Sequence, residues 1–506
     1  MRLQNSARNI KAAWILQIVH ILSQFVSRTA IIKVLTIEYV GLSGLFSNVL
    51  MMLSLAELGI GEAIIFSMYG PIARNERENI GAIMGFYKKV YIFVGVFIMT
   101  AGLAITPWID FFIKDMPDIP EIYWIYALYV INSSVSYFFS YKAAFITANQ
   151  NNSVVVINNG IWEVVMVLMQ VILLVMTGNY ILYMVIGIAF VLFRNISISV
   201  IADRKYPVLK EKNKEPLSKE IFGEIKKNTG AMVFHKIGTI IVFATDNLIL
   251  SKFVGLVSVG IYANYYTITN AVTVFINKFF QAISASVGNL AVNESVEKQE
   301  QTFFRTLFIN FWMYAFSCCC LFNLMNPFIN DIWLGEGFLF GKTIVLLIVV
   351  KIYFTGMRSS VQTFKNAKGL YWQNRYMPIY ESLINLAASL ILVKYIGVAG
   401  VVAGTIISSV ATCVWIEPHV LYKYGFGKSS KKFISKYMGY LAAFALIMAV
   451  TFLCNNIVKG SSAASFVLRC IISGTIPNIM MVLLYSRSEE FKYFIGLMKR
   501  MFKKKI

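Results

Sequence analysis

The chain has 506 residues, of which 58% are hydrophobic and only 14% are charged. Soluble domains average about 25% charged residues, whereas here apolar runs of about 18 residues or more recur along the whole sequence. This composition excludes a soluble enzyme, a disordered chain and a disulfide scaffold. It predicts an all-α polytopic membrane protein.

The charge balance is strongly basic, with 46 Lys and Arg against 25 Asp and Glu, a formal charge of +21. In a membrane protein such an excess marks cytoplasmic loops, so we expect no nucleic-acid partner. The six cysteines lie in apolar segments without metal-ligand spacing. We therefore expect neither a metal site nor disulfides.

The first six predicted spans form an N-terminal bundle within residues 1–203. They cover residues 12–35, 41–69, 83–107, 121–147, 153–176 and 180–203. The charged stretch 204–228 follows, and we interpret it as a cytoplasmic linker between two bundles. Its Leu217, Ile221 and Ile225 lie at helical spacing, which predicts contact with the membrane surface.

The next six predicted spans form a second six-helix bundle within residues 229–422. They cover residues 229–254, 257–284, 304–327, 339–364, 377–396 and 398–422. Two further spans, helices 13 and 14, lie within residues 433–486 (433–456 and 462–486), which brings the prediction to about 14 transmembrane helices. Residues 487–506 predict a basic amphipathic cytoplasmic tail.

The loop charges predict the orientation of these spans. Lys and Arg concentrate in loops 70–89 and 204–228 and in the tail, whereas loop 108–121 on the opposite side is acidic. Because basic loops stay in the cytoplasm, both termini are expected to be cytoplasmic. The expected location is a cytoplasmic membrane.

An internal repeat relates the two predicted bundles. A shift of 216 residues places the segment GLFSN at 44–48 on GIYAN at 260–264. Both repeats start inside and run outward, so they are parallel repeats about a pseudo-two-fold axis along the membrane normal. This architecture is typical of transporters with a site between two halves.

Polar side chains lie on single faces of several predicted spans. The first span carries Gln17, His20, Gln24 and Arg28 at helical spacing, the second carries Ser43, Ser47, Ser54 and Glu57, and the fourth carries Asn132, Ser136 and Ser140. Lipid offers no hydrogen-bond partners, so such faces turn toward protein or water. Many of them together predict a water-filled central cavity.

Ionisable residues within spans mark transport pathways by default. The cationic candidates for a pyrophosphate group are Arg28, Lys351, Arg358, Lys278 and Arg194. The polar or coupling candidates are Asp246, Glu163, Glu57, Gln24 and Asn270. Arginine binds phosphate in a bidentate manner and lysine as a point charge, and polar and aromatic side chains suit sugar hydroxyls.

Internal ion pairing is the structural alternative for these charges. Arg28 and Asp246 lie at similar depth in equivalent spans, and Glu57 and Lys278 are a second candidate pair. Arg194 also lies near a cytoplasmic helix end, where it could reach the aqueous interface.

Three stretches of the chain carry a family resemblance: Phe25 to Gly61 (FVSRTAIIKVLTIEYVGLSGLFSNVLMMLSLAELGIG), Asp246 to Tyr265 (DNLILSKFVGLVSVGIYANY) and Thr355 to Leu386 (TGMRSSVQTFKNAKGLYWQNRYMPIYESLINL). They resemble bacterial polysaccharide repeat-unit flippases of the Wzx type, which export O-antigen, capsule or exopolysaccharide units. The resemblance implies the two-bundle fold shared with multidrug exporters of the MATE kind. It also implies a cationic cavity, which Arg28, Lys351 and Arg358 could supply.

The resemblance further implies the activity: translocation of undecaprenyl-pyrophosphate-linked oligosaccharide from the cytoplasmic to the outer leaflet by alternating access. Expected partners are membrane lipids and the polysaccharide polymerase and export machinery. We expect no cofactor, with H⁺ or Na⁺ coupling through Asp246 or Glu163. Two rivals share the fold, a drug–cation antiporter and a lipid II flippase. A polymerase or glycosyltransferase is disfavoured, because such enzymes usually work from a large outer loop.

Overall fold

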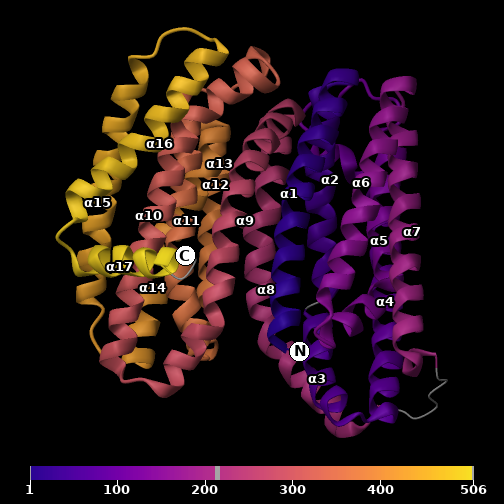
Figure 1. The fold of residues 1–506 in the computed structure, drawn as a ribbon. Helices are drawn as coiled ribbons and strands as arrows, with labels where there is room; N and C mark the ends of the chain where they lie inside the picture. The colour runs from indigo at the N-terminus through magenta and orange to yellow at the C-terminus, as the bar shows by residue number, and fades with distance from the viewer. Residues whose placement is uncertain (1, 58, 211–216, 504–506) are drawn as a thin grey trace. The chain divides into compact units, whose positions relative to one another are not determined.

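The computed structural model describes residues 2–57, 59–210 and 217–503 (Figure 1). Within these ranges the ordered elements are all helical. Part of the predicted linker and residues 504–506 of the predicted tail lie outside the described residues. The chain divides into two compact units, Met1–Ala263 and Asn264–Ile506.

Unit 1 contains eight α-helices and the start of a ninth within its described residues. They are α1 (Arg2–Val34), α2 (Ile37–Leu53), α3 (Ile60–Arg74), α4 (Arg77–Ile105), α5 (Ile122–Ala148), α6 (Asn152–Thr177), α7 (Tyr180–Lys205), α8 (Lys219–Phe253) and the first part of α9 (Leu256–Asn293). Short helical turns η1 (Ser54–Glu57), η2 (Thr106–Phe112) and η3 (Pro207–Leu209) extend or connect them. Helix α1 packs on α6, α6 on α7, and α5 on both α4 and α7, while α8 packs on α2 and α3.

Unit 2 begins with the remainder of α9 and contains the other described helices. They are α10 (Val296–Phe328), α11 (Lys342–Ala367), α12 (Met377–Ile396), α13 (Val398–Ala411), α14 (Cys413–Val420), α15 (Lys431–Asn456), α16 (Ala463–Tyr485) and α17 (Glu489–Lys503). Shorter turns are η4 (Ile329–Trp333), η5 (Glu336–Phe338), η6 (Trp372–Asn374) and η7 (Leu421–Phe426). Helix α10 packs against α11, α15 and α16, and α13 packs against α11 and α12.

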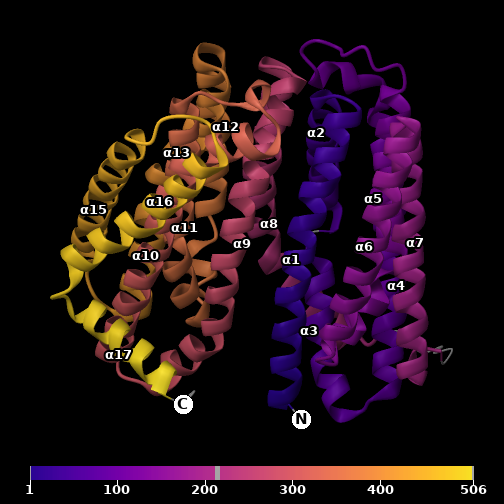
Figure 2. The same cartoon turned by 45° about the horizontal axis from the view of Figure 1, so that its top comes forward.

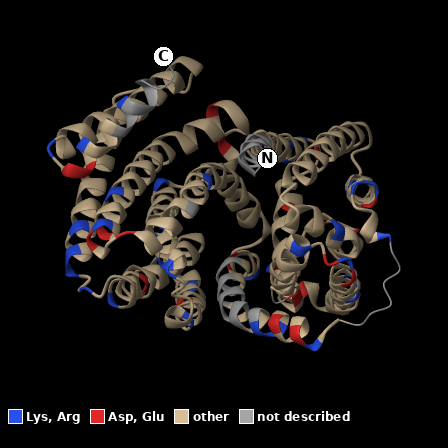
Figure 3. Ribbon diagram, turned by 60° about the horizontal axis from the view of Figure 1, so that its bottom comes forward, with Lys and Arg blue, Asp and Glu red and all other residues tan. Residues whose placement is uncertain are grey.

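Twelve helices among the described residues are long and apolar enough to cross a membrane. With the long helices α5 and α8, they correspond in order to the predicted spans. The all-helical membrane fold is therefore confirmed. Lys and Arg positions recur around the helix ends that come forward in Figure 3.

Small residues allow the closest helix contacts inside each unit, as is common in membranes. A Cβ on Gly404 would lie 2.3 Å from Ser389 Oγ, and one on Gly400 would lie 2.4 Å from the Leu392 carbonyl carbon. These two glycines, four residues apart on α13, therefore bring its backbone against α12. Gly95 on α4 does the same against Phe138 of α5.

Two glycines also lie at a close contact within unit 1, and one of them, Gly260, belongs to the predicted repeat. A Cβ on Gly41 would lie 2.3 Å from the Leu256 carbonyl oxygen, and one on Gly260 would lie 2.5 Å from the Ile37 carbonyl oxygen. The start of α2 and the start of α9 thus use a glycine each to approach the backbone of the other.

The second predicted span, 41–69, is not one continuous helix. Helix α2 ends at Leu53, η1 follows, and α3 starts at Ile60 after Gly59, whose φ of 76° is left-handed. Glycine adopts this conformation without a Cβ penalty. The hydropathy of the segment gave no sign of this interruption, because both parts are apolar.

The predicted linker is also different from the expectation. Helix α8 starts at Lys219, and Ile225 is buried against residues of α3, α4 and α5, with Leu217 and Ile221 packed on the same cluster. Ile221 and Ile225 are one helical turn apart on α8 as predicted, whereas Leu217 precedes the helix, and all three pack against protein.

The tail forms the amphipathic helix α17, which lies across α10 of unit 2 instead of running along it (Figures 1 and 2). The indole of Trp312 stacks on Phe491, with ring centroids 5.8 Å apart, and Arg305 lies 3.9 Å above the ring of Tyr493. Lys436 of α15 forms an ion pair with Glu490. Helix α17 is thus packed on the other helices of unit 2 through its apolar and aromatic face.

Candidate functional site

The polar face of α1 meets α6 in unit 1. Gln24 Nε2 donates to His20 Nε2 over 2.9 Å, and His20 Nδ1 donates to Glu163 Oε1 over 2.7 Å. In this tautomer each ring nitrogen of His20 has one partner. Two of the predicted candidates, Gln24 and Glu163, are therefore connected through a histidine.

Arg194 of α7 interacts electrostatically with Glu163. Its backbone carbonyl accepts a hydrogen bond of 3.1 Å from Asn158 of α6. Hydrogen bonds thus join α1 to α6 through Gln24, His20 and Glu163, and Arg194 adds a positive charge from α7. Arg194 is half-buried beside a carboxylate of its own unit.

Arg28 lies further along α1, in an aromatic environment. Its guanidinium interacts electrostatically with Tyr129 of α5 and Tyr183 of α7. The Tyr129 and Tyr180 hydroxyls are hydrogen bonded at 2.9 Å, and the rings of Tyr180 and Tyr183 stack with centroids 5.4 Å apart. A guanidinium beside phenol hydroxyls offers both charge and hydrogen bonds to a phosphate or to sugar hydroxyls.

Tyr129 also lines a cavity of about 280 Å³ between α2 and α5. The cavity is lined by Ser47, Leu50, Met51, Ser54, Tyr129, Asn132 and Ser133. The structure therefore brings the polar face of the second predicted span against that of the fourth. Asn132 Oδ1 is buried there without a hydrogen-bond partner among the described atoms, so this wall has an acceptor available for a ligand hydroxyl.

Glu57 lies at the interruption between α2 and α3 and contacts tyrosines. Tyr91 of α4 donates to its Oε1 over 2.6 Å, and Tyr137 of α5 donates to its Oε2 over 3.5 Å. Asp246 is buried on α8, near the point where Asn48 of α2 donates to the carbonyl of Ala244 over 3.2 Å. Glu57 and Asp246 thus lie where α2 or its continuation meets neighbouring helices.

In unit 2, Arg358 is part of a buried network of charges. Its Nε donates to Glu417 Oε2 over 3.0 Å and its Nη1 donates to Glu381 Oε1 over 2.9 Å, with Nη2 reaching both carboxylates at 3.4 Å. Lys365 Nζ also donates to Glu417, over 3.0 Å. We name Arg358, Lys365, Glu381 and Glu417 the charge cluster.

The charge cluster changes the interpretation of Arg358. All three nitrogens of its guanidinium contact carboxylates of α12 and α14, so its charge is balanced inside unit 2. Its direct partners are protein carboxylates, as internal ion pairing predicts. Arg358 was expected to be a cation available to a pyrophosphate, and the structure instead shows it in ion pairs.

The remaining candidates of unit 2 lie on α9 and α11. Lys351 is half-buried, and its carbonyl accepts a hydrogen bond from Thr355. Lys278 Nζ lies 3.4 Å from Gln281 Oε1 on the same helix, and Asn270 is half-buried two turns before it.

Sequence reasoning missed several of these groups. Aromatic side chains were assigned to sugar hydroxyls in general, but no tyrosine around Arg28 or Glu57 was selected by position, although Tyr180 and Tyr183 lie three residues apart on one helical face. Glu417 and Lys365 were also missed. Glu417 lies inside the predicted span 398–422, so the rule that selected Arg358 would have selected it, whereas Lys365 lies one residue beyond the predicted span 339–364.

Comparison with known proteins fits a membrane transporter. The sequence profile of a family described as polysaccharide biosynthesis protein matches residues 6–284, and the chain belongs to this family. The profile covers nearly all of unit 1 and α9 as far as residue 284. No curated protein matches the sequence.

Solved structures share the fold at low sequence identity. The lipid II flippase MurJ in an inward closed conformation has a TM-score of 0.68 and 13% identity, over 94% of this chain and 98% of that chain. An inward-facing MATE family multidrug transporter of the MOP superfamily has a TM-score of 0.61 and 14% identity, over 78% and 93%. A MOP superfamily transporter from Pyrococcus furiosus has a TM-score of 0.53 and 13% identity, over 85% and 97%. The chain is therefore a multi-pass membrane protein with the fold of these transporters.

Proposed function

We propose that the protein is a flippase for undecaprenyl-pyrophosphate-linked oligosaccharide repeat units. It moves them from the cytoplasmic to the outer leaflet by alternating access, for surface polysaccharide assembly. The observation that carries the proposal is the match to the polysaccharide biosynthesis family across residues 6–284, which include the polar groups of unit 1. The fold supports transport rather than enzymatic catalysis. It does not determine the substrate, which is inferred from the residues of the site.

In this proposal Arg28 binds the pyrophosphate. It supplies a guanidinium on the polar face of α1, beside the hydroxyls of Tyr129 and Tyr183. Lys278 and Lys351 of unit 2 are further candidates for phosphate oxygens. Arg194 and Arg358 are assigned a supporting electrostatic role. Arg194 interacts electrostatically with Glu163, and Arg358 forms ion pairs with Glu381 and Glu417.

The sugars occupy the polar cavity next to Tyr129. Its serines and Asn132 offer donors and acceptors at neutral sites, which suits uncharged hydroxyls better than phosphate. The polyprenyl chain stays in the lipid, since its transfer to a polar cavity would be unfavourable.

Coupling to a proton gradient is assigned to Glu163 with His20. The carboxylate is hydrogen bonded to His20 of α1 and interacts electrostatically with Arg194 of α7, so a change in its protonation alters its interactions with both helices. Glu163→Gln is expected to make translocation insensitive to an imposed pH gradient while leaving pyrophosphate binding intact. A gradient response equal to wild type would remove Glu163 from coupling and leave Asp246 as the candidate, with Na⁺ as the alternative ion.

The test is leaflet accessibility of labelled undecaprenyl-pyrophosphate oligosaccharide in proteoliposomes. Wild type is compared with Arg28→Ala and with Arg74→Ala, an exposed arginine paired with Glu76 that serves as the matched control. We expect translocation by wild type and Arg74→Ala and none by Arg28→Ala. Translocation by all three would remove Arg28 from the mechanism, and none by any, with ion gradients supplied, would refute the flippase.

Lipid II is the second candidate substrate, because the structure of the lipid II flippase MurJ matches this chain over 94% of its length. Lipid II offered in the same vesicles as a competitor separates the two. Preferential movement of lipid II would reassign the substrate. Drug efflux from loaded vesicles, without glycolipid movement, would favour the antiporter of the MATE kind.

Both termini are proposed to be cytoplasmic, in the bacterial cytoplasmic membrane. The basic loops support this orientation. A phosphatase fused after residue 506 is expected to be inactive, whereas one inserted at Asp118 is expected to be active.

A further inference from the structure

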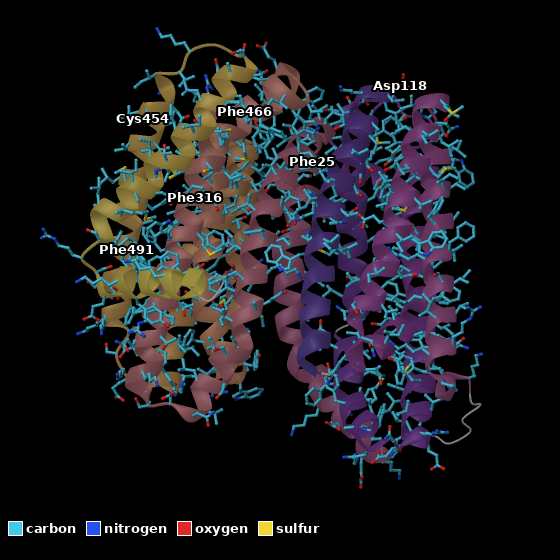
Figure 4. The ribbon with its side chains drawn as sticks, in the orientation of Figure 1. Phe25, Asp118, Phe316, Cys454, Phe466 and Phe491 are labelled. Atoms are coloured by element: carbon cyan, nitrogen blue, oxygen red, sulfur yellow. The ribbon has the colours of Figure 1, made fainter. Side chains whose placement is uncertain are left out.

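A second polar cavity, of about 330 Å³, lies entirely within unit 2 and away from the charge cluster. Its walls come from the end of α10, the start of α11, the end of α15 and the start of α16. Figure 4 labels Cys454 of α15 and Phe466 of α16 at this end of the unit, opposite to Phe491 of α17. We name it the outer pocket, because the proposed orientation places this end outside the cytoplasm.

Three buried polar atoms of the outer pocket have no hydrogen-bond partner among the described residues: Asn330 Oδ1, Asn455 Oδ1 and Arg469 Nε. A buried polar atom without a partner costs about 1–3 kcal/mol. Several of them in one cavity therefore indicate a site that a polar ligand completes.

The other atoms of these side chains are fixed by the protein. Asn455 Nδ2 donates to Thr451 O over 3.0 Å and to Ser473 Oγ over 3.1 Å, so its amide orientation is set. Arg469 Nη2 donates to the carbonyls of Val458 and Gly460, at 2.9 and 3.3 Å. The unpartnered atoms are thus pre-oriented, which lowers the entropic cost of binding.

The chemistry of the lining selects the class of ligand. Two amide oxygens and the carboxylate of Asp331 accept hydrogen bonds, whereas Arg469 and Lys342 donate them. The acceptor oxygens would repel a phosphate group, and the positive charges of Arg469 and Lys342 would repel a metal ion or an amine. A hydroxyl both donates and accepts, so a polyhydroxylated ligand satisfies both sets.

An aromatic wall adds to this selection. The rings of Phe322 and Phe452 contact each other with centroids 5.5 Å apart, and Lys342 Nζ lies 5.3 Å from the Phe452 centroid. Apolar ring surface beside hydrogen-bonding groups is the usual composition of a small-ligand pocket, and the volume lies at the lower end of the roughly 300–1,000 Å³ range of such sites.

We propose that the outer pocket is a saccharide-binding site that takes sugar residues of the glycan on the outer side of the membrane. The assignment rests on the proposed function and on its orientation for the identity of the sugar. It gives α15 and α16, which lie beyond the two predicted six-helix bundles, a direct part in handling the glycan.

The test measures binding of a lipid-free oligosaccharide to the full chain in nanodiscs. The probe is the repeat-unit oligosaccharide released by mild acid from the lipid-linked precursor, followed by calorimetry and saturation-transfer NMR. Asn330→Leu combined with Asn455→Leu is expected to weaken binding about tenfold or more. Lys342→Gln, at an exposed position that does not threaten folding, is expected to weaken binding severalfold.

Two controls leave the pocket intact. Lys459→Gln changes an exposed lysine in the neighbouring α15–α16 loop, and Arg74→Ala changes an exposed arginine of unit 1. Both are expected to bind the probe as wild type does. Undiminished binding by both pocket variants, or no binding by wild type, would overturn the proposal. So would binding that Arg28→Ala abolishes and the pocket variants leave unchanged, which would place the sugar in unit 1 alone.

The outcomes separate this inference from the proposed function. Pocket-dependent binding without glycolipid translocation would refute the proposed flippase function and support the saccharide site. Translocation without pocket-dependent binding would keep the flippase and overturn the site. Inorganic pyrophosphate that competes with the probe at the outer pocket would show an anion site and overturn the saccharide assignment.

Discussion

Glu417 offers the sharpest test of the structure, because its environment fixes the size of the effect. Its side chain is 1% exposed and accepts hydrogen bonds from Arg358, Lys365 and Gln362. The two cations and two carboxylates of the charge cluster cancel. Glu417→Gln keeps the shape but leaves one buried positive charge without compensation.

Breaking a buried pair by removing one partner costs about 3–5 kcal/mol. We expect Glu417→Gln to lower the free energy of unfolding by about that amount, measured by denaturant titration in mixed micelles. Lys365→Met added to Glu417→Gln restores neutrality, so the double variant is expected to recover most of the loss. This reversal of sign distinguishes charge balance from a general sensitivity of the site.

The matched control is Glu294→Gln. It breaks the exposed pair of Glu294 with Lys298, four residues apart on the surface, which is worth about 0.3–0.5 kcal/mol. A Glu417→Gln variant as stable as this control would refute the buried, balanced cluster. So would a double variant that is less stable than Glu417→Gln alone.

Three further predictions concern packing and hydrogen bonds, each followed by thermal unfolding in detergent. Gly356→Ala places a Cβ 2.1 Å from the Tyr314 ring and is expected to cost about 1–3 kcal/mol, whereas Gly439→Ala on α15 meets nothing within 4 Å and is expected to be neutral or stabilising; equal effects would contradict the packing. Tyr91→Phe removes the 2.6 Å hydrogen bond to Glu57 and is expected to cost about 1.5–3 kcal/mol. Tyr137→Phe, which removes a contact of 3.5 Å, is expected to cost clearly less, and the reverse order would disprove the geometry around Glu57.

The spans and their order could be predicted from the sequence because one physical quantity, hydropathy over a membrane thickness, decides them. The interruption at Gly59 could not, since α2 and α3 are both apolar and only the backbone conformation separates them. The apolar helix face that carries Ile225 was predicted correctly, but the sequence pattern does not show whether protein or lipid covers that face.

The residues of the candidate site could be predicted only in part from the sequence, for a related reason. Helical spacing places His20, Gln24 and Arg28 on one face, because residues of one helix share a known geometry. It does not reveal that Glu163, 143 residues from His20, is their partner. The pairing of Arg358 with Glu417, 59 residues away, is likewise a property of how helices assemble.

The charge cluster also has a consequence for biosynthesis. Helix α11 carries Lys351, Arg358 and Lys365, and a cation at the centre of an inserting helix costs about 2.5–3.5 kcal/mol on translocation scales. The carboxylates that balance Arg358 are encoded 23 and 59 residues later. At about 5–20 residues per second, Glu417 emerges roughly 3–12 s after Arg358. We therefore expect helix α11 to stay beside the insertion machinery until its partners are made, so that the helices of the second unit enter the membrane as a group.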